Sequence, residues 1–256
     1  MMTLAGRTAV VTGAGNGLGR AMAAHLHAAG ARVVLTGRDR DKLAATAVAL
    51  DLLPERHRVA TVDVADPDSV AELANELADE DVSVLVNNAG VPGPVSDLVD
   101  VEPADWDDVF AVNVRGVYLM CRAFLPGMLE RRAGDIINVA SVSGKRPLAR
   151  RTPYCASKMA VIGLSATLAF EEGPHGIRVN TLSPGPVRGP RMDRNFTLEA
   201  TRTGTSVAQA EAAFVSRAAL GRMVEEDEVG AAVVALLTIP GLTAADLDLS
   251  GGMVAR

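Results

Sequence analysis

Tyr154 and Lys158 stand four positions apart in a run of helix-forming residues, so a helix would bring both side chains to one face. A tyrosine with its usual pKa of about 10 is a poor base at neutral pH. A neighbouring ammonium group stabilises the phenolate and lowers that pKa. The pair is therefore a candidate acid/base for interconverting an alcohol and a carbonyl compound. Spacing alone is also compatible with an ordinary helix surface.

A glycine-rich segment near the N-terminus has the composition of a phosphate-binding loop. Residues 12–19 read T-G-A-G-N-G-L-G, after an apolar run and before a helix-forming stretch. Glycine lets the backbone approach a pyrophosphate at a helix N-terminus, where free N–H groups and the helix dipole favour an anion. The spacing is not G-x-G-x-x-G, because Leu18 interrupts it. We predict a dinucleotide site here, with a plain strand-to-helix turn as the alternative.

The residues that follow the second predicted strand bear on which dinucleotide binds. A carboxylate at this place holds the ribose 2′-hydroxyl of NAD(H), whereas an arginine accommodates the 2′-phosphate of NADP(H). The chain reads Gly37-Arg38-Asp39, and Arg38 offers a bidentate guanidinium. NADP(H) is the expected cofactor. NAD(H) is the alternative, with Arg38 solvated and Asp39 on the ribose.

Two kinds of segment alternate along the chain and predict how these residues are positioned. Short β-branched runs, apolar throughout as in strands buried on both faces, occur at residues 8–12, 32–36, 58–62, 82–86, 135–140, 177–182 and 246–249. Ala- and Leu-rich stretches with helical spacing include residues 18–29, 41–50, 69–78 and 105–129. Repeated βαβ units of this kind predict an α/β fold: a single Rossmann-like, doubly wound parallel sheet with helices on both faces.

One long stretch interrupts this alternation. Residues 184–224 show no strand pattern, only turn residues followed by a helical stretch at 206–219. An excursion of this length in a compact domain is more often functional than idle. We predict a substrate lid at about residues 186–222 of a single domain that spans residues 1–256, since no linker-like segment divides the chain.

Composition and charge exclude several classes of protein. The 256 residues carry a formal net charge of −6, which leaves no global basic surface for nucleic acid. We find neither a signal-peptide core nor an uncharged run of the roughly 20 residues that a membrane helix needs. Cys121, Cys155 and four scattered histidines form no metal-ligand pattern. We expect a cytoplasmic protein with free thiols and a small-molecule substrate, and with no metal, nucleic-acid or membrane partner.

Several short motifs follow one another in a specific order. They are the loop at residues 12–19, Asp63-Val64, Asn87-Asn88-Ala89-Gly90, Asn113, Ser141, Tyr154-x-x-x-Lys158 and Pro184-Gly185. In these motifs and in the separations between them, residues 5–253 resemble the short-chain dehydrogenase/reductase (SDR) family.

The resemblance implies an NAD(P)(H)-dependent oxidoreductase that interconverts a secondary alcohol and a ketone by hydride transfer. Tyr154 would be the acid/base, and Lys158 would bind the nicotinamide ribose and lower the tyrosine pKa. Ser141 would bind the substrate oxygen, with Ser143 as the competitor for this role. Asn113 would hold a water in a proton relay through Lys158, or would simply cap a helix kink.

The resemblance also implies cofactor contacts and subunit assembly. Besides Arg38, Tyr154 and Lys158, the cofactor would be held by Gly13, Asn16, Gly17, Leu18, Gly19, Asp63, Val64, Asn87, Ala89, Gly90, Pro184, Gly185 and Val187. Asn16 replaces a basic residue that NADP-preferring members usually carry, which weakens the NADP(H) prediction. A homo-oligomer, tetramer or dimer, is expected.

Cations gather in the segment between Ser141 and Tyr154, which would border the substrate. Lys145, Arg146, Arg150 and Arg151 lie there in a chain of negative net charge. A local positive potential would attract an anionic substrate. The predicted substrate residues are Ser143, Arg150, Arg151 and Arg191. The alternative is that these charges are solvated or lie between subunits.

Three other readings of the function stay open. The substrate could be a 3-oxoacyl thioester, or a sugar or polyol. A non-enzymatic dinucleotide-binding scaffold is the alternative from another class, because one fold hosts many functions. Such a scaffold would not need the four residues Asn113, Ser141, Tyr154 and Lys158.

Overall fold

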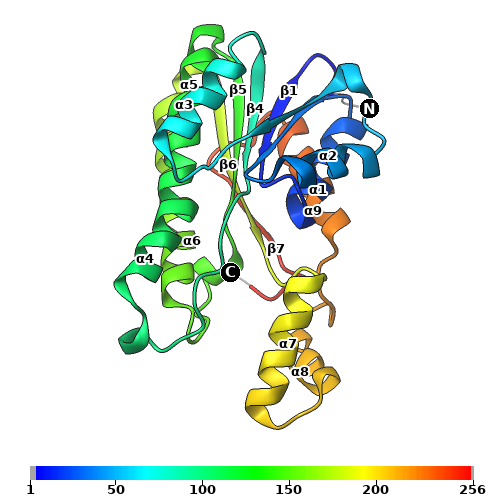
Figure 1. The fold of residues 1–256 in the computed structure, drawn as a ribbon, viewed down its shortest axis with the longest axis vertical. Coiled ribbons are helices and arrows are strands. Elements are labelled where there is room, and N and C mark those ends of the chain that lie inside the picture. The colour runs from blue at the N-terminus through cyan, green and yellow to red at the C-terminus, as the bar shows by residue number, and fades with distance from the viewer. Residues whose placement is uncertain (1–3, 255–256) are drawn as a thin grey trace.

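A seven-stranded parallel sheet forms the centre of the protein, as the alternation of apolar segments predicts (Figure 1). The computed structural model describes residues 4–254. The strands are β1 (Thr8–Thr12), β2 (Arg32–Gly37), β3 (His57–Thr61), β4 (Val82–Asn87), β5 (Gly134–Val139), β6 (Ile177–Pro184) and β7 (Asp246–Leu249). Their order is β3-β2-β1-β4-β5-β6-β7. The order reverses between β1 and β4, so a crevice opens at the carboxyl ends of these strands.

Helices cover both faces of the sheet, so the predicted doubly wound architecture is confirmed (Figure 1). One face packs against α1 (Gly17–Ala28), α2 (Arg40–Ala49) and α9 (Glu226–Thr238). The other packs against α3 (Pro67–Glu76), α5 (Gly116–Arg131) and α6 (Thr152–Glu172).

The strands are apolar throughout because each contributes side chains to two separate cores. Val11 and Leu35 face the first core together with Met22 of α1, whereas Val10 and Val34 face the second. Successive strand residues point to opposite faces of a sheet. The first layer carries the glycine-rich loop at the start of α1, and the second carries Tyr154 and Lys158 on α6. The predicted cofactor loop of one layer and the predicted catalytic residues of the other therefore lie at the same crevice.

The stretch predicted as one helix over residues 105–129 is two α-helices joined by a wider turn. They are α4 (Pro103–Phe110) and α5, and the segment between them, Ala111–Arg115, is π-helical. Asn113 lies in this segment and is fully buried. A π-turn inserts an extra residue into the helix and is frequent at functional sites.

One helical stretch in the described part of the chain, Pro103–Arg131, is long and apolar enough to cross a membrane by length and composition. In the fold its second half covers the sheet, and Val117, Met120 and Met128 are buried in the second core. A core helix of this kind passes the same test as a membrane span, so the stretch is weak evidence for one.

The segment after β6 forms a pair of helices that projects away from the sheet (Figure 1). They are α7 (Pro190–Thr203) and α8 (Val207–Val215), so the predicted helix at 206–219 exists in shorter form and α7 was missed. Gly204, in the left-handed region with φ 68°, ends α7, and Ser206 begins α8 with a capping box. Phe196 and Phe214 pack edge to face between the two helices. We call this pair the α7–α8 excursion.

Candidate active site

A cleft of about 1770 Å³ opens at the carboxyl edge of the sheet, beside the α7–α8 excursion. The structure brings most of the predicted site residues into its walls: Gly13, Asn16, Gly17, Leu18, Gly19, Arg38, Asp63, Val64, Ala89, Gly90, Ser141, Ser143, Arg150, Arg151, Tyr154, Lys158, Pro184, Gly185, Val187 and Arg191. Two predicted residues of the described chain, Asn87 and Asn113, are not among those that line it.

The glycines after β1 allow a closeness of backbone and helix that other residues would prevent. Gly13 has φ 69°, and a Cβ there would lie 2.9 Å from Nδ2 of Asn88. A Cβ on Gly19 would overlap the carbonyl oxygen of Gly13, so α1 could not approach β1 this closely. The loop therefore fits a pyrophosphate at the N-terminus of α1, as the sequence predicts for a dinucleotide.

Asn88 rather than Asn87 faces this loop. The Nδ2 of Asn88 donates to the carbonyl of Thr12 at 2.8 Å, and its backbone N–H donates to the Thr12 hydroxyl at 2.9 Å. Asn87 instead donates from Nδ2 to Oδ1 of Asn138 at 2.9 Å, inside the core. The Asn87 side chain points to the other face of the sheet, because successive residues of β4 alternate between faces, and its contact with the cofactor stays a prediction.

The Tyr154 side chain lies among hydrogen-bond donors and positive charges. Ser141 lies two residues after the end of β5 and caps the short turn Val142–Gly144, and its hydroxyl also hydrogen-bonds to Tyr154. Burial alone would raise the pKa of Tyr154. The charges of Lys158 and Arg191, with hydrogen bonds from Ser141 and Arg191, outweigh it and hold the pKa below its usual value. The lowered pKa makes Tyr154 a better acid/base than an ordinary tyrosine.

Lys158 is buried one helical turn from Tyr154. Its Nζ donates to the carbonyl of Val139 at 2.9 Å and lies 5.8 Å from the centre of the Tyr154 ring. Burial lowers the pKa of Lys158, and the nearby Tyr154 partly offsets this effect. Gly90 lies beside Lys158 and Asn113, since a Cβ there would lie 3.6 Å from this Nζ and 3.1 Å from Oδ1 of Asn113.

The Asn113 side chain is committed to the protein rather than to the cleft. Its Oδ1 accepts the backbone N–H of Val91 at 2.8 Å, and its Nδ2 donates to the Val91 carbonyl and to the Ser157 hydroxyl. Both amide hydrogens are therefore used. Asn113 fastens the loop after β4 to α6, one residue from Lys158, and the water relay stays a prediction.

The cluster of cations before Tyr154 is smaller than the sequence predicts. Lys145 is buried and forms ion pairs with Asp246 and Asp248 of β7, so it is a structural residue. Arg150 is exposed, and its Nε lies 3.6 Å from Oδ1 of Asp97. Arg151, in contrast, is buried next to Tyr154. Sequence separation hid these pairings, since each carboxylate lies far from its partner along the chain.

Comparison with known proteins agrees with this geometry. Residues 7–200 match the family model described as short chain dehydrogenase. The chain is a member of the SDR family. It is also 36% identical to D-threitol dehydrogenase of Mycolicibacterium smegmatis (strain ATCC 700084 / mc(2)155), over 97% of this chain and 93% of the relative.

Two solved SDR structures resemble the whole fold. A single-substitution variant of actinorhodin polyketide ketoreductase with NADPH has a TM-score of 0.91 and 32% identity, covering 99% of each chain. An NAD⁺-bound xylitol dehydrogenase has a TM-score of 0.90 and 27% identity, covering 97% of this chain and 99% of that one. The protein is therefore an NAD(P)-dependent SDR oxidoreductase that interconverts alcohols and ketones.

Proposed function

We propose that Tyr154 exchanges a proton with the substrate oxygen while Ser141 holds that oxygen in place. A bound nicotinamide supplies or accepts the hydride at the carbinol carbon. Lys158 would bind the nicotinamide ribose, and its charge, 5.8 Å from the centre of the Tyr154 ring, helps to hold the pKa of Tyr154 below its usual value. In ketone reduction, Tyr154 donates its proton to the oxygen as the hydride reaches carbon. In alcohol oxidation the same hydroxyl, deprotonated, accepts it.

One observation carries this proposal: Ser141, Lys158 and a lowered Tyr154 pKa occur together at one cleft. The test is Tyr154→Phe, with turnover followed by nicotinamide absorbance and cofactor binding followed by fluorescence. We expect turnover to fall by a factor on the order of 10² to 10⁴ while cofactor binding persists. A variant with unchanged turnover would favour the scaffold reading.

NADP(H) is the proposed preferred cofactor. Arg38 lines the cleft and is exposed, and no described carboxylate lies within ion-pair distance of it. Asp39 caps α2 through the backbone N–H of Lys42 and pairs with the Lys42 ammonium at 2.9 Å. The Asp39 carboxylate, the alternative partner for the cofactor ribose, therefore already has hydrogen-bond and ion-pair partners within the protein. Separate titrations with NADPH and NADH test the preference.

We also propose a cytoplasmic homo-oligomer, dimer or tetramer. Tyr118 of α5 and Met159 and Phe170 of α6 are large apolar side chains exposed on one chain, and Phe170 is 80% exposed. Contact between copies would cover such side chains. Light scattering tests the assembly, and a mass near 26.6 kDa would contradict it.

The similar proteins differ from one another in the class of substrate that their names give. A relative oxidises a polyol by its name, and a neighbour is a polyketide ketoreductase. Both activities use the same proton-transfer group, so polyols and 3-oxoacyl thioesters both belong in the first substrate screen.

A further inference from the structure

Arg151 is a buried cation without an ionic partner. Its residue is 8% exposed, and its Nη2 donates to the carbonyl of Pro92 at 2.8 Å. Its Nε is buried and has no hydrogen-bond partner. Within residues 4–254, no carboxylate lies at ion-pair distance from this guanidinium. A buried charge without a counter-charge is costly, so this position needs an explanation.

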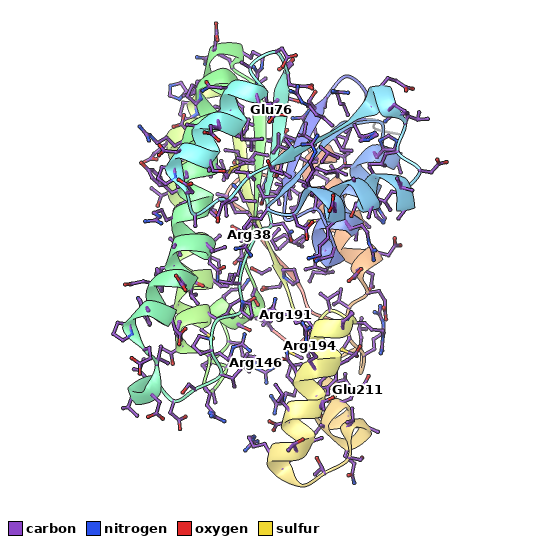
Figure 2. The ribbon with its side chains drawn as sticks, viewed as in Figure 1. Arg38, Glu76, Arg146, Arg191, Arg194 and Glu211 are labelled. Carbon is purple, nitrogen blue, oxygen red and sulfur yellow. The ribbon has the colours of Figure 1, made fainter. Side chains whose placement is uncertain are left out.

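A second unpaired guanidinium lies close to the same tyrosine ring. Arg191 belongs to the first turn of α7, and its Cζ lies 5.5 Å from the centre of the Tyr154 ring. The Cζ of Arg151 lies 5.3 Å from that centre. Burial and the nearby charge of Arg191 both lower the pKa of Arg151, so the two cations disfavour each other in the absence of an anion. Figure 2 shows Arg191 where α7 meets the space in front of the sheet.

Several cations that hold parts of the fold together have carboxylate partners within the chain. Lys145 pairs with Asp246, Arg188 with Glu225, and Arg202 with Glu199. The chain thus neutralises the cations that hold its own structure together. Arg38, Arg146 and Arg194 also line the cleft without a carboxylate partner among residues 4–254, but only Arg151 and Arg191 lie against the Tyr154 ring. Arg191 is exposed, whereas Arg151 is buried and is therefore the cation that most needs an anion from outside the chain.

We propose that Arg151 and Arg191 bind a carboxylate of the substrate, and that the substrate is an α- or β-oxo acid or the corresponding hydroxy acid. This proposal rests on the proposed function, because it takes Tyr154 as the residue that contacts the reacting oxygen. The carboxylate takes no part in the bond changes: reduced nicotinamide gives hydride to the ketone carbon, and Tyr154 gives its proton to the oxygen.

The distances select a carboxylate close to the reacting carbon. The substrate oxygen must lie within hydrogen-bond distance of the Tyr154 hydroxyl, and Arg191 hydrogen-bonds to Tyr154 itself. A group bound by these guanidiniums therefore sits beside the carbonyl and not at the end of a long chain. Arginine binds planar carboxylates through two parallel hydrogen bonds, which also orients the ketone.

Paired acids and esters test this proposal. Acetoacetate with methyl acetoacetate, and α-oxobutyrate with its methyl ester, differ within each pair mainly in the negative charge. In Arg151→Gln and Arg191→Gln we expect kcat/KM for the acids to fall by roughly 10- to 100-fold and for the esters by less than about threefold. Arg202→Gln is the control, since it lies on the same helix and already pairs with Glu199. Equal losses for acid and ester would overturn the proposal and leave the arginines only a role in the pKa of Tyr154.

A binding measurement separates this proposal from the proposed function. Calorimetry on Tyr154→Phe loaded with oxidised cofactor should detect acetoacetate and not methyl acetoacetate, and Arg191→Gln in that background should remove the signal. Absence of acetoacetate binding overturns the carboxylate site whatever the enzyme reduces. Binding by a protein that reduces no ketone would instead refute the proposed function alone. Because Arg151 anchors Pro92, a folding defect in Arg151→Gln leaves Arg191→Gln as the deciding variant.

Discussion

The Nζ of Lys145 lies 2.7 Å from Oδ2 of Asp246, although the two residues are 101 positions apart. Lys145 follows the turn that begins at Ser141, and Asp246 begins β7 at the edge of the sheet. The lysine side chain is only 3% exposed and also pairs with Asp248. These ion pairs therefore link the turn Val142–Gly144 to strand β7.

Lys145→Met should destabilise the protein strongly. It leaves two carboxylates without their counter-charge, and such a loss at a buried pair costs about 3–5 kcal/mol. Asp246 and Asp248 keep 18% and 21% of their side-chain exposure, so we expect roughly 2–4 kcal/mol here. Urea unfolding of the variant and the parent measures this loss in the free energy of unfolding. Lys42→Met, which removes an exposed pair with Asp39, should cost at most about 1 kcal/mol, and equal losses would contradict the anchoring role.

Local patterns in the sequence are enough for the sheet, the glycine-rich loop and the placement of Tyr154 and Lys158 on one helix face, whereas the addition of Ser141 to this group comes from the resemblance to the SDR family. Each depends on short apolar runs or on motifs at strand ends, and parallel strands bring their carboxyl ends together. The pairing of Lys145 with Asp246 could not be predicted, because no local sequence pattern links two residues so far apart in the chain. For this reason Lys145 counts, from the sequence alone, among the cations that would border the substrate, although not among the predicted substrate residues.

Three other features could not be predicted from the sequence, each for a different physical reason. Every residue of β4 except Ser83 is buried, so alternation along the strand could not tell which face Asn87 takes. Helix α7 is rich in charged and polar residues and buries only Phe196 and Ala200, so it lacks the Ala- and Leu-rich composition that marks the predicted helices. The π-helical turn at Asn113 depends on the hydrogen bonds to Val91, which lie outside the helix itself.

Arg191→Gln should shift the pH profile toward higher pH. The Arg191 charge and hydrogen bond help to hold the pKa of Tyr154 below its usual value, so their loss raises that pKa. Alcohol oxidation needs the deprotonated tyrosine, so the rising limb of kcat/KM for a neutral alcohol moves to higher pH. Ketone reduction needs the protonated form, and its falling limb moves the same way. An unshifted profile would contradict the electrostatic role, and Arg202→Gln serves as the matched control.

Gly19→Ala should damage both stability and cofactor binding. The new Cβ would overlap the carbonyl oxygen of Gly13, a backbone atom that cannot move without displacing the loop. Overpacking of this kind costs about 1–3 kcal/mol, and the displaced loop should weaken NADPH binding by roughly tenfold or more, on the order of 1.4 kcal/mol. Thermal unfolding and fluorescence titration measure the two effects. Gly173→Ala, where no atom lies within 4 Å of the added Cβ, should change neither by much.

Arg38→Gln should weaken NADPH binding and leave NADH binding nearly unchanged. A guanidinium bound to the 2′-phosphate contributes a charge-assisted hydrogen bond that NADH cannot make, so the loss should be roughly 10- to 100-fold in Kd for NADPH alone. Parallel fluorescence titrations with the two reduced cofactors measure the ratio.

Asp39→Asn is the counterpart of this variant, because Asp39 already caps α2 and pairs with Lys42. We expect it to leave the Kd of both cofactors within about threefold of the parent, since an asparagine caps a helix nearly as well. A selective loss of NADH binding in Asp39→Asn, with no effect of Arg38→Gln, would assign the ribose to Asp39 and reverse the preference. If Arg38 binds the cofactor, its loss weakens NADPH binding relative to NADH binding. If Asp39 binds it, its loss weakens NADH binding relative to NADPH binding. Titrations of the two variants with both cofactors therefore decide between these assignments.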